Sequence, residues 1–114
     1  MRTRFLVGIV LLVSVLAYAA LAGQTQAQET KPSAVEVKID NFTFSPAELR
    51  VKAGTQVTWI NKDDIPHNIV SEDKSFKSKV MDTDERFTFT AATPGTYPYF
   101  CGIHPHMRGK LIVE

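Results

Sequence analysis

The sequence has little cysteine, no excess of charge of either sign and no pattern typical of a long amphipathic helix after its first 27 residues. Cys101 is the only cysteine, so no internal disulfide can stabilise the fold. Thirteen Lys and Arg residues stand against twelve Asp and Glu residues, which excludes the strongly basic surface of a nucleic-acid-binding protein. In an oxidising compartment a lone thiol needs protection, either by burial or by a bound metal.

The chain begins with an apolar segment. Arg2 and Arg4 precede an apolar run over residues 5–22, and small-residue cleavage patterns follow it. This arrangement predicts a secretory signal peptide over residues 1–27. The run is close to the ~18 apolar residues that cross a bilayer, so an uncleaved anchor is the alternative, and only in that form do we expect membrane contact.

The remaining chain is long enough for one small domain. Residues 28–34 are polar, include Pro32 and predict a flexible linker, and residues 35–114 form the expected domain. Without Arg2 and Arg4, 13 − 2 = 11 basic residues face 12 acidic ones, a net charge of −1.

Short segments of the domain have the two-residue period of strands. The segments are residues 35–39, 49–53, 56–61, 86–91 and 110–114. Several short strands at this spacing indicate a sandwich or a barrel. No segment of the domain predicts a capped amphipathic helix, and only residues 45–48 and 63–79 leave room for a short helical turn.

The segment YFCGIHPHMRGK, residues 99–110, contains three candidate metal ligands at a spacing of three: Cys101, His104 and Met107. A strand leads into Cys101, and the chain is expected to turn at Gly102. We therefore expect a short loop between two strands that directs the three side chains toward a common point.

The residue types select the metal. His67 in DIPHNIV, just before another expected strand, is the candidate fourth ligand. Thiolate and thioether are soft ligands that disfavour magnesium and calcium, and zinc seldom uses methionine. Two histidines, a cysteine and a weak axial methionine are the ligands of blue-copper electron-transfer sites. We expect one copper ion, Cu(I)/Cu(II).

Two neighbouring histidines compete for one ligand position. Consecutive residues of an extended segment point in opposite directions, so His106 faces away if Met107 faces the copper, and His104 is the expected ligand. The competing model is a zinc-like site of Cys101, His104 and His106, with His67 as an ordinary surface residue.

Two segments, FTFSPAELRVKAGTQVTWINKDDIPHNIV and GTYPYFCGIHPHMRGKLIVE, resemble the cupredoxins of the plastocyanin type. The spacing Cys-x-x-His-x-x-Met is most similar to that of the amicyanins. The resemblance extends from Val35 onward and implies an all-β, eight-stranded Greek-key sandwich. It also implies a copper ion at one end of the sandwich, held by His67, Cys101, His104 and Met107.

The same resemblance implies a periplasmic protein that carries single electrons between redox partners. Asn68 is expected to tie the two ligand segments together by hydrogen bonds, and donor and acceptor to dock transiently near His104. Four protein ligands leave no coordination position for a substrate, so we expect no enzyme activity. We also expect a monomer that binds no nucleic acid.

Two residues depart from the family pattern. Pro98 cannot donate a hydrogen bond within a sheet, so we expect its nitrogen to face an edge, a bulge or solvent. His106 stands where amicyanin-like loops carry an apolar residue.

Two other functions would use the same residues. A copper carrier or storage protein would have the same ligands but release the metal readily. A cysteine-dependent enzyme would need an accessible thiolate of low pKa and an oxyanion site, and the sequence around Cys101 indicates neither.

The other prominent side chains have structural roles in this interpretation. We expect Trp59, Phe87 and Phe89 in the core, and Met81 to be structural. A solvated region of mixed charge is expected from Lys74, Lys77 and Lys79 together with Asp63, Asp64, Glu72 and Asp73.

Overall fold

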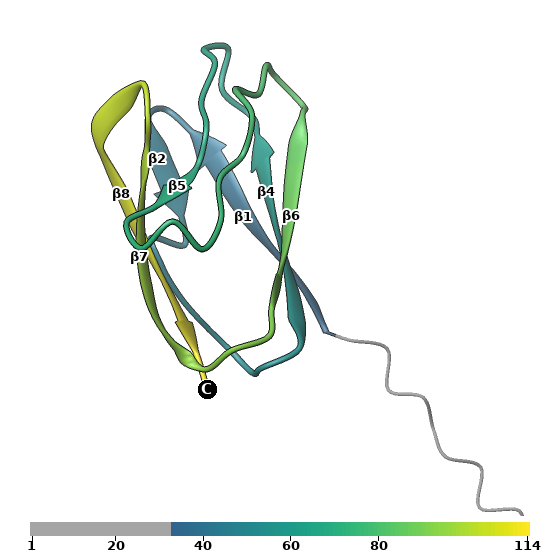
Figure 1. Ribbon diagram of the computed structural model, residues 1–114. Helices are drawn as coiled ribbons and strands as arrows, with labels where there is room; N and C mark the ends of the chain where they lie inside the picture. Colours follow the sequence, from purple (N-terminus) through teal and green to yellow (C-terminus); the bar gives the residue numbers. More distant parts are fainter. Residues whose placement is uncertain (1–32) are drawn as a thin grey trace, which may run out of the picture.

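The computed structural model describes residues 33–114, which form two four-stranded sheets packed face to face (Figure 1). The predicted signal peptide and most of the predicted linker lie outside the described residues. The strands are β1 (Ala34–Asp40), β2 (Thr43–Ser45), β3 (Glu48–Val51), β4 (Thr55–Asn61), β5 (Val70–Ser71), β6 (Arg86–Ala91), β7 (Gly95–Cys101) and β8 (His104–Val113). The expected eight-stranded sandwich is confirmed, and the barrel is excluded.

The alternation of apolar and polar residues sets the two faces of each strand. In β1, Val37 and Ile39 are fully buried, whereas Lys38 between them is exposed. In β4, Trp59 is fully buried, and its ring lies 5.8 Å from that of Phe87 on β6. The predicted core position of Trp59 is therefore confirmed, whereas Phe87 and Phe89 are half-buried and pack against the core from β6.

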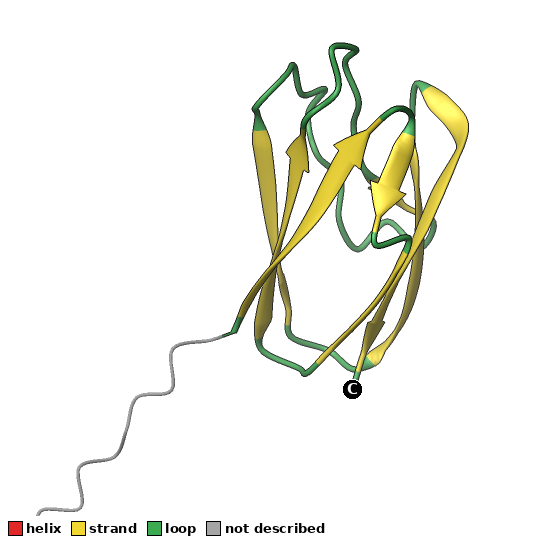
Figure 2. Cartoon of the chain, turned by 180° about the vertical axis from the view of Figure 1, so that it is seen from behind, coloured by secondary structure: helices red, strands yellow, loops and turns green. Residues whose placement is uncertain are grey.

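The strand order is β2-β1-β4-β6 in one sheet and β3-β8-β7-β5 in the other. Every connection from β2 to β7 passes from one sheet to the other, and each sheet contains one parallel pair, β1 with β4 and β3 with β8. These crossings hold the two sheets together, as the view from behind shows (Figure 2).

The described residues are all strand, turn or loop, so the expected lack of a long helix is confirmed there and neither place left open for a short helical turn is helical (Figure 2). In the long connection from β4 to β6, the backbone instead pairs with itself: the amide of Ser78 donates to the carbonyl of Ile69 at 2.8 Å. Such pairing satisfies buried peptide groups without helix. Within residues 33–114 no helix is long and apolar enough to cross a membrane.

Pro98 lies in β7 where little is lost by its missing amide hydrogen. The opposite residue, Lys110 of β8, donates its amide to Ala47 instead. The carbonyl of Pro98 accepts from the amide of Glu72, the residue directly after β5. The nitrogen of Pro98 thus faces the side where β5 has ended, in agreement with the predicted edge position.

Of the connections at the end of the sandwich opposite the C-terminus, the upper end in Figure 1, three carry the residues of the predicted site and its surroundings. They are the β1–β2 turn, the start of the β4–β5 connection and the β7–β8 turn. In the last of these, Cys101 pairs directly with His104, so only Gly102 and Ile103 form the turn and Met107 already lies in β8. The expected loop carrying three ligands is therefore wrong: the motif is a tight hairpin, because β8 begins six residues earlier than predicted.

Candidate metal centre

Three of the predicted ligands meet at this end of the sandwich. The Sγ atom of Cys101 lies 3.7 Å from Nδ1 of His67 and 3.6 Å from Nδ1 of His104, and the two Nδ1 atoms are 3.2 Å apart. Cys101 and His67 are fully buried, and His104 is half-buried. Residues from the β4–β5 connection and the β7–β8 hairpin thus converge on one point, as predicted.

The size of this triangle fits a bound metal ion. With sides of 3.2, 3.6 and 3.7 Å, the point equidistant from the three atoms lies about 2 Å from each of them. Imidazole nitrogen and thiolate sulfur bind divalent metals at about 2.0–2.3 Å. The three donor atoms are therefore already spaced for a metal, and the pair of imidazoles with a thiolate suits copper.

Backbone and side-chain contacts fix the orientation of His67. Its amide donates to the carbonyl of Met81 at 3.1 Å, and its carbonyl accepts from the amide of Met81 at 2.8 Å. On the ring, Nε2–H donates to Oδ2 of Asp63 at 2.9 Å. A proton held on Nε2 leaves the lone pair of Nδ1 directed toward Cys101 and His104, which is the tautomer that a metal ligand needs.

Asp63 is the important residue that sequence reasoning missed. We expected it in a solvated region of mixed charge, but it is buried, with 6% of its surface exposed. The hydrogen bond from His67 and a second one from the amide of Phe42 (3.0 Å) lower the pKa of Asp63 to about 2, although burial opposes the shift. The carboxylate therefore stays ionised through the neutral pH range and can hold the ring of His67.

Asn68 connects the two ligand segments in the manner expected. Its Oδ1 accepts the amide hydrogen of Gly102 at 2.6 Å, and its own amide donates to Sγ of Cys101 at 3.5 Å. A Cβ atom at Gly102 would lie 3.0 Å from both terminal atoms of the Asn68 side chain. The glycine therefore leaves room for this bridge across the site.

The two remaining residues of the motif point in different directions. Met107 is buried, with 6% exposed, whereas His106 beside it is exposed. The competing site of Cys101, His104 and His106 is not formed, because His67 takes the third place in the cluster. The alternation along β8 explains the difference.

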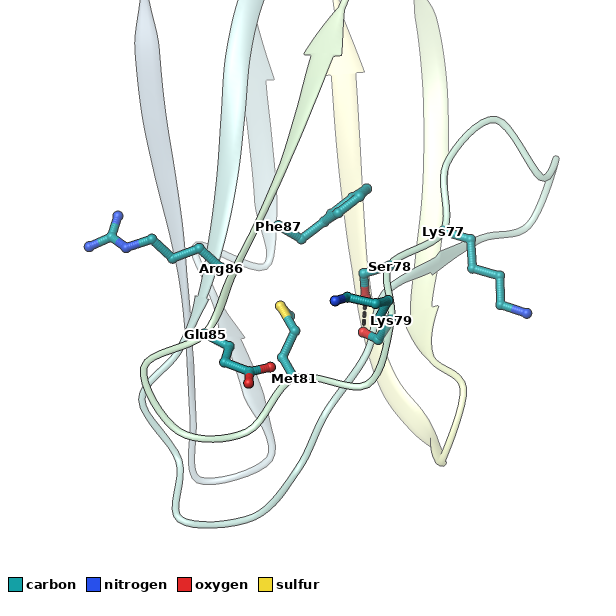
Figure 3. A pocket seen from close by; sticks show the side chains of 7 residues that line it. All are labelled: Lys77, Ser78, Lys79, Met81, Glu85, Arg86 and Phe87. Atoms are coloured by element: carbon teal, nitrogen blue, oxygen red, sulfur yellow. Dashed lines mark hydrogen bonds between the residues drawn. The ribbon is translucent and has the colours of Figure 1, made fainter.

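Met81, the other thioether of the described residues, lines a separate pocket of about 340 Å³. Figure 3 shows its sulfur on the side of Phe87, among the residues that line this pocket. The backbone of Met81 pairs with that of His67. The pocket is lined by Lys77, Ser78, Lys79, Met81, Glu85, Arg86 and Phe87. Met81 is also part of the buried core, in keeping with the structural role expected for it.

A family model described as a cupredoxin-like domain matches residues 9–113. The chain belongs to the cupredoxin-like family. This confirms the resemblance seen in the sequence. Membership of this family supports the two predictions of one copper ion and of a function in electron transfer. The cluster of His67, Cys101 and His104 agrees with both.

The most similar relatives include amicyanins. This chain is 36% identical to amicyanin-alpha of Methylorubrum extorquens over an aligned segment of 102 residues. The aligned segment covers 84% of this chain and 86% of the relative. The chain is 38% identical over 93 residues to amicyanin of Paracoccus denitrificans, with coverages of 77% and 71%. Among solved structures, a purple cupredoxin from Nitrosopumilus maritimus has a TM-score of 0.68 at 33% identity and covers 70% of this chain and 99% of that one.

Proposed function

We propose that this cupredoxin is a type 1 copper protein that carries single electrons between redox proteins outside the cytoplasm. The residues that would hold the copper are His67, Cys101 and His104, together with the buried Met107. The observation that carries the proposal is the buried triangle of one sulfur and two nitrogen atoms, each about 2 Å from a common point. Copper held there supplies the exchange of one electron between its two oxidation states.

The chain supports fast electron transfer by holding its ligands in place. Asp63 fixes the ring of His67, and Asn68 fixes the turn after Cys101. Hydrogen bonds of this kind keep the ligand atoms in one arrangement, so little rearrangement accompanies a change of charge. The burial of Cys101 and His67 excludes water, and a site with four protein ligands offers no place for a substrate, which favours a carrier over an enzyme.

We propose that redox partners dock at the end of the sandwich that carries His104. This histidine is half-buried, and the large apolar side chains beside it in sequence and in space are exposed: Ile103 at 48% and Phe42 at 43%. Transient complexes of redox proteins use small interfaces. A monomeric protein in the periplasm, exported by the predicted signal peptide, is part of the proposal.

The first test is an absorption spectrum of the purified protein with copper(II). We expect an intense blue band from the bond between the thiolate and copper, which disappears on reduction and in Cys101→Ala. A colourless protein that prefers zinc would contradict the proposal. A blue protein that loses copper to a competing chelator within seconds would instead indicate a copper carrier.

Met107 should tune the site more than build it. We expect Met107→Gln to keep copper and colour but to lower the reduction potential, because the harder oxygen ligand favours copper(II). Cyclic voltammetry measures the shift, with Met81→Leu as a control that should leave the potential unchanged. If Met81→Leu shifts the potential and Met107→Gln does not, the two methionines have been assigned the wrong way round.

A further inference from the structure

The turn between β1 and β2 contains an unusual residue. Asp40 pairs with Thr43, so the hairpin closes through Asn41 and Phe42 alone, and both have positive φ angles, 49° and 56°. Two-residue turns of this shape favour Asn followed by Gly. Asn41 fits the preference, but a bulky aromatic side chain at the second position is a true outlier that the surroundings must hold in place.

Contacts with the metal centre hold Phe42 in this conformation. Its amide donates to Oδ2 of Asp63, the same oxygen atom that accepts from Nε2 of His67. Its ring stands at 87° to both imidazoles, with centroid distances of 5.4 Å to His67 and 5.0 Å to His104. Edge-to-face contacts at these distances are attractive. One side chain therefore contacts both histidines of the site.

The position of the ring explains how a site at the end of the sandwich stays dry. Phe42 is 43% exposed, so solvent reaches its ring while His67 beneath it is fully buried and His104 is only partly exposed. A glycine at this position would satisfy the turn but would cover neither imidazole. The chain thus carries a residue that its backbone geometry disfavours, at a position from which its aromatic ring spans both histidines.

We propose that Phe42 shields the two imidazoles from solvent and that retention of copper depends on this shield. Bound copper would be lost if water or a chelator displaced its ligands, and the half-buried His104 is the accessible one of the two histidines. A ring packed on both imidazoles slows that displacement. The shielding of the imidazoles concerns the protein alone, whereas the dependence of copper retention on it rests on the proposed copper function.

The shield is tested first in the metal-free protein. Diethyl pyrocarbonate modifies accessible imidazoles, and mass spectrometry gives a rate for each histidine. We expect Phe42→Gly to increase the rate at His104 by about tenfold, from the loss of aromatic cover and contact. Phe42→Leu should give an intermediate rate, and the exposed His106 should react equally in all variants.

Thermal unfolding of the same metal-free variants separates shielding from folding. Because glycine suits the positive φ angle, we expect Phe42→Gly to unfold at the same temperature as the original protein or higher. Val80→Ala removes another exposed apolar side chain and should change neither measurement. Equal modification rates at His104 in the original protein and in both Phe42 variants would contradict the proposal that Phe42 shields this imidazole.

Copper retention is tested with the loaded protein and excess EDTA. We expect the blue band to decay about tenfold faster in Phe42→Gly than in the original protein or Val80→Ala. Equal decay rates would overturn the dependence of retention on Phe42. The absence of a blue band in the original protein would refute the proposed function and, with it, the dependence of copper retention on Phe42, while the modification rates still decide the shielding of the imidazoles.

Discussion

Replacement of His67 or His104 by alanine is expected to abolish the blue copper spectrum, whereas His106→Phe should retain it. The Nδ1 atoms of His67 and His104 form two corners of the ligand triangle, and loss of either leaves copper with one imidazole. His106 is exposed and belongs to no part of the cluster. Absorption spectra and copper content after dialysis measure the outcome.

The three variants control for one another. All of them should keep the circular dichroism of a β-protein, which separates loss of a ligand from loss of the fold. Since His67 is fully buried, His67→Gln is a second variant that retains a polar group for the contact with Asp63. A colourless His106→Phe together with a blue His67→Ala would mean that the ligand assignment is wrong.

Gly109→Ala is expected to destabilise the whole domain severely. A Cβ atom at this position of β8 would overlap with Cζ and the hydroxyl oxygen of Tyr99. That ring is 1% exposed and packs edge-to-face against Phe44 and Trp59, so it has no free space into which to move. Overpacking of this kind costs about 3 kcal/mol, which corresponds to a melting temperature lower by roughly 12–24 °C.

The cause is checked by removing the ring. In a Tyr99→Leu background the added methyl group meets a smaller side chain. Gly109→Ala should therefore lower the free energy of unfolding clearly less in that background than in the original protein. Denaturant unfolding of the four proteins gives the coupling energy. If Gly109→Ala lowers the free energy of unfolding equally in both backgrounds, the close approach of Tyr99 does not explain why this position requires glycine.

The parts of the molecule that the sequence predicted well are those governed by local pattern and by chemistry. Alternation in β1 and β4 identifies strands, because a two-residue period places every second side chain in the core. The metal cluster follows from residue types, because Cys101 and His104 are soft or borderline ligands close in sequence. His67 is 34 residues away from Cys101, and its membership followed from chemistry and from family resemblance.

The parts that were missed depend on contacts between distant segments. Asp63 stands beside the exposed Asp64 and resembles any solvated carboxylate in sequence. In the fold it is buried, and Phe42 and His67 from distant and neighbouring segments both donate to it. Its position four residues before a candidate ligand histidine is the one signal that could have identified it. Phe42 shares a two-residue period with the buried Phe44, but the left-handed turn lifts its ring out of the core and onto the histidines.

The parallel pairing of β3 with β8 has a consequence for how this protein is made. Glu48 pairs with Lys110 and Val51 with Val113, so the second sheet cannot close until the last residues of the chain are available. Contacts between such distant segments make folding slow, since a long loop must close before any of them form. Cys101 and Met107 lie on the two strands that complete this sheet. A chain whose last residues are still on the ribosome therefore cannot complete this sheet, so we expect Cys101 and His104 to reach their final positions only after synthesis has ended.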